Sequence, residues 1–295
     1  MKHILTCLGM AMVILTTAGS AMGISMIPGD PAACFSWTYV GETDFDDPAI
    51  PGEADGGIRI GEVSVMALLP MFEPDGWTIG IGITGDWYRF TFPDRDDITG
   101  VDAYAIGVPV FAALNTGRWE LWTSILPGLF SDFRDLGGAD FKTQFHCLAG
   151  YSVCSTLALS LGLAYDSAFG AHKMYPIGGA VWEPSPRLSV RLVLPEASCM
   201  WLAADGLLLT VAIQPAGGEW HMYDEEDNTV DYGFREESWR SGLSCEVRLA
   251  GPLWLQVAGG LDFARTYRIE GSGTELLSSN AGDTWFMRMM LNVRP

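Results

Sequence analysis

Hydrophobic and polar residues alternate with a period of two along much of the chain. In residues 76–90 (GWTIGIGITGDWYRF), one parity carries Trp and Ile, and the other carries Gly, Thr and Asp. Such alternation is typical of a β-strand with one apolar face and one small or polar face. The same pattern recurs at residues 141–154, 157–166, 238–249, 253–264 and 284–293. We therefore predict an all-β chain.

The first of these strands also contains the spacing G-x-G-x-x-G, at Gly80, Gly82 and Gly85. In a dinucleotide-binding fold this spacing opens a helix whose N-terminus holds the pyrophosphate. Here strand-forming residues continue to Pro93, and no helix is predicted. We interpret Gly80 and Gly82 as small residues on an inner face, where they relieve crowding and let strands coil around a modest lumen.

The predicted strands are roughly twice as long as strands in ordinary globular sheets. Their apolar faces begin or end with Trp, Tyr or Phe, and short and long links largely alternate along the chain. A soluble sandwich also shows period-two alternation. Length, aromatic ends and link pattern together favour an antiparallel transmembrane β-barrel of about 12 strands, within a range of about 10–14. The count is least certain at residues 174–223, which are interrupted by Pro176, Pro184, Pro186, Pro195 and Pro215.

The N-terminus has the layout of a secretory signal peptide. A short basic start at Lys2 and His3 precedes an apolar run and then small residues. We predict a signal peptide at residues 1–21, with cleavage near Ala21–Gly23, followed by one outer-membrane barrel domain over residues 24–295. No later apolar run is long enough for a membrane-spanning helix.

Charge and cysteine content narrow the class of partner. The formal net charge is −19. An acidic surface of this strength repels nucleic acid, so we expect no nucleic-acid partner. The five cysteines beyond the signal peptide are scattered and predict neither a disulfide framework nor a zinc site.

A short motif resembles a known family. The chain has Gly179, Trp182 and Pro184 in the spacing G-x-x-W-x-P, followed by a strand that ends in Leu194-Pro195. In this turn and strand, and in its layout, the chain is similar to a family of bacterial outer-membrane β-barrel proteins of unknown function. The resemblance implies a barrel architecture and an outer-membrane location, and it implies no catalytic residues.

Charged and polar residues on the inner parity of the predicted strands are candidates to line a lumen. In a wide barrel they set ion selectivity, and in a narrow one they pair and plug it. Both alternatives stay open at this point. The predicted lumen-lining residues are Lys142, Gln144, His146, Asp166, Arg240, Glu246, Arg248, Asp262 and Arg288.

Other candidate chemistry is weak. His146 and Ser152 share a strand face, but six residues along a strand span about 20 Å, so they cannot pair in a hydrolase. No G-x-S-x-G motif is present. The acidic loop at residues 224–235 fails the EF-hand pattern because Thr229 and Arg235 replace the required Gly and Glu. We predict no catalytic residue, no cofactor and no metal, and treat His172 and His221 as unremarkable.

These features predict an outer-membrane barrel that is a narrow channel or transporter for small solutes. One alternative is a closed structural or adhesive surface barrel, and a less favoured one is a lipid-acting hydrolase. The predicted partners are outer-membrane lipid and lipopolysaccharide, through divalent cations at acidic loops, and the barrel-assembly machinery. We expect a monomer. The acidic clusters are Asp44, Asp46 and Asp47; Asp94, Asp96 and Asp97; and Asp224–Asp227 with Asp231.

Overall fold

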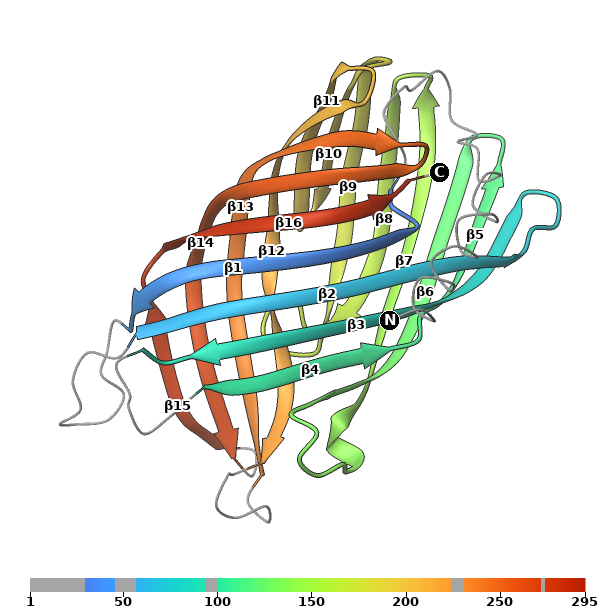
Figure 1. Cartoon of the computed structure of the whole chain (residues 1–295). Helices are drawn as coiled ribbons and strands as arrows, with labels where there is room; N and C mark the ends of the chain where they lie inside the picture. The colour runs from blue at the N-terminus through green and yellow to red at the C-terminus, as the bar shows by residue number, and fades with distance from the viewer. Residues whose placement is uncertain (1–29, 46–56, 94–99, 224–230, 272–273, 295) are drawn as a thin grey trace.

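Period-two alternation produces one closed antiparallel sheet in a computed structural model of the chain (Figure 1). The structure describes residues 30–45, 57–93, 100–223, 231–271 and 274–294. Its elements are β1 (Ala33–Asp44), β2 (Gly57–Phe72), β3 (Trp77–Thr91), β4 (Val101–Gly107), β5 (Val110–Thr116), β6 (Trp119–Ser131), the 3-10 helix η1 (Gly138–Asp140), β7 (Phe141–Cys154), β8 (Leu157–Asp166), β9 (Lys173–Ser185), β10 (Leu188–Leu194), β11 (Glu196–Ala204), β12 (Leu207–Tyr223), β13 (Asp231–Ala250), β14 (Leu253–Gly271), β15 (Thr274–Ala281) and β16 (Thr284–Val293).

The sheet closes because its first and last strands pair. β1 lies antiparallel to β16, with Phe35 opposite Leu291. β4 and β5 follow one another between β3 and β6, and β15 and β16 follow one another along β14. The sixteen segments therefore make a closed antiparallel barrel of 14 strands. The all-β barrel expectation is confirmed, and the strand count falls at the top of the expected range, two above its centre.

The strand connections define two ends of the barrel. Tight turns join β2 to β3, β5 to β6, β7 to β8, β9 to β10, β11 to β12 and β13 to β14. We call this the short-turn end. The opposite end, called the long-loop end, carries the longer connections and two short ones, Pro195 between β10 and β11 and residues 272–273 between β14 and β15. The alternation of short and long links predicted from the sequence is therefore present in the described strands.

The glycines of β3 have a packing role. Gly80 lies opposite Phe111 of β5, and a Cβ on Gly80 would overlap the Phe111 ring and the Leu69 carbonyl oxygen. β3 continues as a strand through Gly85 to Thr91. The interpretation of Gly80 and Gly82 as space for inner-face side chains fits this geometry, whereas Gly85 lies on the outer parity opposite Val65. The stretch is a strand and does not form a phosphate-binding turn.

Three further sequence expectations meet the structure differently. The G-x-x-W-x-P residues lie within strand β9, because the turn that follows comes only after Ser185. The predicted signal peptide lies outside the described residues, as do most of the acidic clusters. No helix in the described part of the chain is long and apolar enough to cross a membrane.

Candidate functional site

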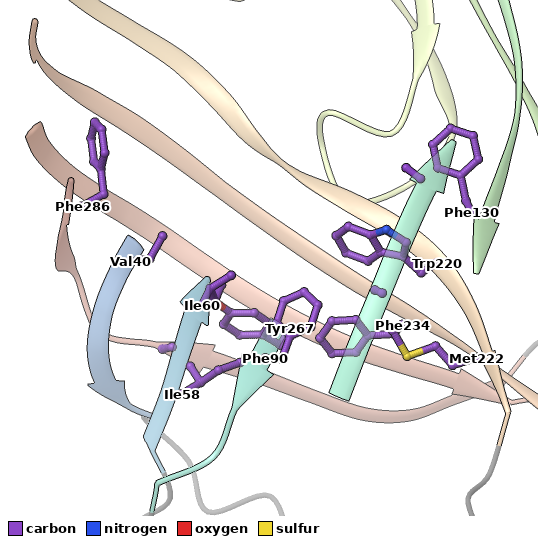
Figure 2. Packing of buried hydrophobic residues seen from close by; sticks show 13 residues of the cluster. Val40, Ile58, Ile60, Phe90, Phe130, Trp220, Met222, Phe234, Tyr267 and Phe286 are labelled. Carbon is purple, nitrogen blue, oxygen red and sulfur yellow. The ribbon is translucent and has the colours of Figure 1, made fainter. Parts of the chain in front are cut away.

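An apolar core fills the barrel interior at its long-loop end (Figure 2). One wall, built from β1–β6, contributes inward side chains such as Ile60, Phe90 and Phe130, and the facing wall of β12–β16 contributes Trp220 and Phe234. The Trp220 ring lies 5.6 Å from that of Phe90, and Phe234 lies 4.8 Å from Phe90. Trp220 is 1% exposed. The two walls therefore pack against each other and close the axis of the barrel at this end.

A charged clamp crosses the lumen beside this core. Arg240 of β13 donates through Nη1 to Glu62 of β2 at 2.9 Å, and through Nε to Asp262 of β14 at 2.6 Å. Its Nη2 also donates to Glu62. All three side chains are buried. The clamp joins β2 to β13 and β14, so it fixes the spacing of the two walls that carry the apolar core.

A second polar group lies on the inner face of β7–β9. His146 Nε2 and the Tyr175 hydroxyl both bind Asp166 Oδ2, at 2.7 Å each. The backbone N–H of Ala168 donates to the other oxygen of Asp166 at 2.9 Å. Asp166 thus fixes the start of the β8–β9 loop, while Ser124 of β6 is the cross-strand neighbour of His146.

The half of β12 toward the long-loop end bends inward from the barrel wall. One parallel bridge joins His221 of β12 to Ser131 of β6. Glu219 binds Lys142 of β7 at 3.3 Å and His172 Nδ1 at 2.9 Å. Lys142 is on the inner parity of β7, whereas Glu219 is on the outer parity of β12. The inner face of β7 therefore covers the outer face of β12 in this region.

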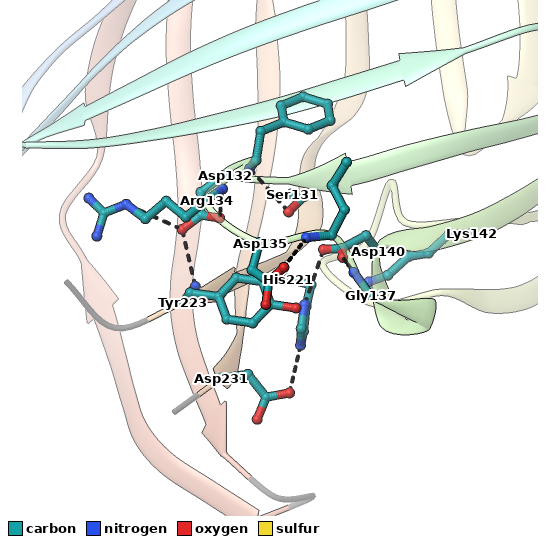
Figure 3. A network of polar contacts seen from close by, with 12 residues as sticks. Ser131, Asp132, Arg134, Asp135, Gly137, Asp140, Lys142, His221, Tyr223 and Asp231 are labelled. Carbon is teal, nitrogen blue, oxygen red and sulfur yellow. Dashed lines mark hydrogen bonds and ion pairs between the residues drawn. The ribbon is translucent and has the colours of Figure 1, made fainter. Parts of the chain in front are cut away.

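The β6–β7 loop is held to the end of β12 by a polar network (Figure 3). His221 binds Asp140 through Nδ1 at 3.1 Å and Asp231 through Nε2 at 2.8 Å. The Tyr223 N–H donates to Asp132 at 3.1 Å. Asp140 is fully buried. Because η1 and two strand ends meet here, the network closes the interior to one side of the apolar core.

The remaining predicted lumen residues are spread along the barrel. Gln144 lines a 210 Å³ cavity that adjoins the apolar core. Arg288 donates to Thr38 at 3.0 Å, on the wall formed by β16 and β1. Glu246 is buried and accepts from Asn292 at 2.8 Å, near the short-turn end. Arg248 binds the Gly251 carbonyl of its own turn at 2.6 Å, so it is not brought together with the others.

On the short-turn side of the apolar core, part of the interior stays accessible to solvent. Trp122 shares the inner face of β6 with Ser124, yet it is 38% exposed. Fourteen strands exceed the eight or so whose interior is just filled by side chains. The interior is therefore closed toward the long-loop end and partly open along β6 toward the short-turn end, where Leu202, Leu208 and Trp254 form a second, smaller buried cluster on the opposite wall.

Several residues at the centre of the site were missed by sequence reasoning. Glu62 and Tyr175 lie on inner parities and could have been found from alternation in their strands. His172 and His221 were judged unremarkable, and this is wrong because each binds a carboxylate at the long-loop end. Nothing in the local sequence announces these partners, because they come from distant strands.

Metal and thiol chemistry have little support in the described residues. Within them, no group of three or more His, Cys, Asp or Glu side chains is arranged to hold a metal ion. Cys34, Cys147, Cys154, Cys199 and Cys245 are free thiols. Asp231, from one acidic cluster, binds His221.

Comparisons with known proteins supply a family and distant barrels. A family model described as "Domain of unknown function (DUF6268)" matches residues 98–293. No curated protein matches the chain. Among solved structures, the chain is similar to a COG4313 outer membrane channel from Pseudomonas putida F1, at 11% identity over 91% of this chain and 97% of that one, with a TM-score of 0.43.

Two further solved structures show a similar degree of likeness. Outer membrane phospholipase A from Escherichia coli is 9% identical over 90% of this chain and 97% of that one, with a TM-score of 0.36. A deltaS2 mutant of the TodX monoaromatic hydrocarbon channel is 10% identical over 92% of each chain, with a TM-score of 0.38. The barrel fold of this chain rests on its own strand pairing.

Proposed function

The chain belongs to the DUF6268 family, a domain of unknown function, and we propose that it is an outer-membrane β-barrel that passes small solutes along a narrow path. The observation that carries this proposal is the partly open interior toward the short-turn end, where the inward Trp122 is 38% exposed, next to a closed long-loop end. We further propose that the chain is exported by its signal peptide, is inserted by the barrel-assembly machinery, and acts as a monomer among outer-membrane lipid and lipopolysaccharide.

The outer surface supports a membrane location. Large apolar side chains stand exposed in rows on the outer parity of many strands, and Leu161 is 72% exposed. Soluble monomers rarely expose contiguous apolar patches above a few hundred Å². A barrel with an apolar outer band and aromatic girdles is instead suited to lipid. The exposed outer-face residues include Phe35, Val65, Leu69, Ile81, Ile83, Leu159, Leu161, Leu163, Leu192, Leu243, Leu249 and Leu261.

The interior supports a restricted path more than an open pore. The apolar core lies across the barrel axis, and Trp220 and Phe90 are both within 1% of full burial. Beside it, Arg240 pairs with Glu62 across the lumen and with Asp262 on the neighbouring strand. A solute that passes along the axis must therefore displace apolar packing, and we expect the conductance to be low at rest.

Conductance in planar lipid bilayers tests this proposal. We expect small, infrequent current steps from the mature wild-type chain, and larger steps from the double variant Trp220→Ala, Phe90→Ala, which removes the centre of the core. The matched control is Trp182→Ala with Leu161→Ala, which shortens exposed outer-face residues. Heat-modifiable migration on a gel checks that each barrel is folded.

The outcomes separate the two main functions. A rise in conductance in the core variant alone supports a path closed by the apolar core. If neither the wild type nor the folded core variant conducts, the channel proposal fails and the closed structural barrel replaces it. The acidic outer loops would then be the part of the molecule to investigate for surface binding.

A further inference from the structure

The barrel wall has a notch beside strand β12. β10 and β11 are 7 and 9 residues long, between the 13 residues of β9 and the 17 of β12. β10 pairs with β9 only as far as Gly178, and β11 pairs with β12 only as far as Ile213. Residues 173–177 of β9 and 214–220 of β12 therefore lack a neighbouring strand on these sides within the described sheet. Five residues of strand span about 17 Å.

Proline marks both edges of this notch. Pro176 lies in the free stretch of β9, and Pro215 in the free stretch of β12, while Pro195 forms the tip of the hairpin between them. Proline has no N–H to donate, so it suits an unpaired edge and discourages an added strand. Open backbone at membrane depth is tolerated where it lines a cavity. The sequence of both strand edges is therefore compatible with a stable gap in the barrel wall.

The notch lies at the height of the apolar outer band. Met174 on its β9 edge is 67% exposed, and its cross-strand neighbour Tyr165 and the next outer residue Leu163 are also exposed. The outer parity of β12 carries Pro215 and Gly217 along most of the notch and becomes polar at Glu219, at the long-loop end of the notch. Most of the opening therefore lies at the level of the apolar outer band.

An apolar groove runs along the outer face to the notch. Its lower part is an 830 Å³ hollow lined by Trp201, Leu209 and Val257, among others. Its upper part is a 480 Å³ hollow that includes Leu192 and Ile213, directly beneath the hairpin tip. The two hollows share Cys199, Val211 and Leu243, so they form one continuous groove.

The β8–β9 loop covers the notch from one side. The Phe169 ring lies 5.0 Å from Tyr175 on the inner face of β9, and 5.8 Å from Trp239 on the outer face of β13. Lys173 Nζ stands 4.7 Å above the same ring. The loop ends at His172, which binds Glu219 through both its N–H and Nδ1 at 2.9 Å. Phe169 thus packs between the inner face of β9 and the outer face of β13, beside the notch.

A cavity lies immediately behind this loop. The 210 Å³ cavity is lined by Ser167 at the start of the loop, by Gly217 and Gly218 of the free β12 stretch, and by Thr84 and Gln144 of the lumen. Its upper boundary is the apolar core, because Tyr88, Phe130 and Trp220 also line it. The cavity therefore lies between the notch and the part of the lumen toward the short-turn end.

We propose that the notch is a lateral entrance, through which uncharged hydrocarbon-like molecules dissolved in the lipid pass along the groove, past Phe169, into the cavity and lumen. This inference rests on the proposed function and names its route and solute class. The chemistry fits an uncharged solute because the groove is apolar and the two carboxylates beside the notch are occupied, while Asp86 in the cavity lining is hydrogen-bonded to Ser64. Asp166 is bound by His146 and Tyr175, and Glu219 by Lys142 and His172.

Photolabelling of the full mature chain in lipid nanodiscs tests the route. The probe is dodecane that carries a single diazirine, and mass spectrometry locates its adducts. We expect adducts at Phe169 and at the cavity residues Thr84 and Gln144 that excess plain dodecane abolishes. Adducts at Leu161, on the open lipid face of β8, should persist because bulk lipid supplies them.

Variants on either side of the entrance sharpen the test. Ala197→Phe fills the groove opposite Leu192, and we expect a several-fold loss of cavity adducts. Its matched control, Ala149→Phe, adds the same bulk to the outer face of β7 and should change nothing. Phe169→Ala removes the cover, and we expect a several-fold gain at Thr84 and Gln144.

Each result decides the proposal. It is overturned if the cavity residues of the folded wild type and Phe169→Ala barrels stay unlabelled, or if the Ala197→Phe and Ala149→Phe variants behave alike. Conductance of the same preparations separates this outcome from the channel proposal. Current steps with an unlabelled cavity leave an aqueous path and remove only the lateral entrance. A labelled cavity without current leaves the lateral entrance and removes the aqueous path.

Discussion

Arg240 joins two walls of the barrel through buried ion pairs with Glu62 of β2 and Asp262 of β14. Replacement by Met keeps the length of the side chain but leaves Glu62 buried without its ion-pair partner and leaves Asp262 with Arg265 alone, at 3.5 Å. Breaking a buried pair in this way costs about 3–5 kcal/mol. We expect Arg240→Met to lower the free energy of unfolding by that amount, measured by urea titration of the barrel in detergent micelles.

An exposed ion pair gives the control for this prediction. Arg187 in the β9–β10 turn binds Asp205 in the β11–β12 turn at 3.0 Å at the short-turn end, and both side chains are exposed. Such pairs contribute about 0–1 kcal/mol. If Arg187→Met and Arg240→Met destabilise the barrel equally, the clamp does not join the walls.

Sequence alternation was informative about these residues only in part. It placed Arg240, Asp262 and His146 on inner parities, because a period of two decides the face of every residue in a strand. It could not supply Glu62, which lies 178 positions from Arg240. That pairing depends on which strands face each other across a closed and pinched barrel, and no local pattern records this.

Strand β12 is the element with two distinct halves. Residues 208–213 pair with both β11 and β13, whereas residues 214–219 have β13 alone as a strand neighbour in the described sheet. Amides that point toward the notch have no ladder partner there. We expect these amides to exchange with deuterium much faster than those of residues 208–213, measured residue by residue in nanodiscs.

Because both sets of amides belong to β12, residues 208–213 serve as the control for residues 214–219 in the same sample. They share depth, solvent and fold, so a difference in exchange reports the missing neighbour. Equal protection of residues 208–213 and 214–219 would mean that another segment pairs along the free edge. The notch would then be closed in solution.

At the same scale, the prolines explain where sequence interpretation failed. Residues 174–223 resisted a strand count because Pro usually interrupts a central strand. Pro176 and Pro215 instead occupy edges without a strand neighbour on one side, so four strands, β9–β12, fit into that region. The same residues that obscured the count are thus the local record of the notch.

The whole molecule combines an apolar exterior with an interior that is closed at one end and partly open at the other. Long strands, aromatic ends and alternating links were enough to predict the exterior and the barrel. The pinch was not predictable, because it requires the outer face of β12 to be covered by β7 instead of by lipid. Alternation assigns each residue to one of the two faces of a strand, but it does not determine which part of the molecule or solvent contacts that face.

The position of the tryptophans allows the membrane placement to be tested on the intact barrel. Seven of the eleven are exposed on outer parities, whereas Trp220 and Trp254 are buried. In bilayers of lipids with brominated acyl chains, we expect bromine contact to quench the greater part of the tryptophan emission. Trp220→Phe should remove only unquenched emission, and Trp285→Phe only quenched emission. Emission that is insensitive to bromination would mean that the apolar rows do not face lipid, and the channel and its lateral entrance would lose their common basis.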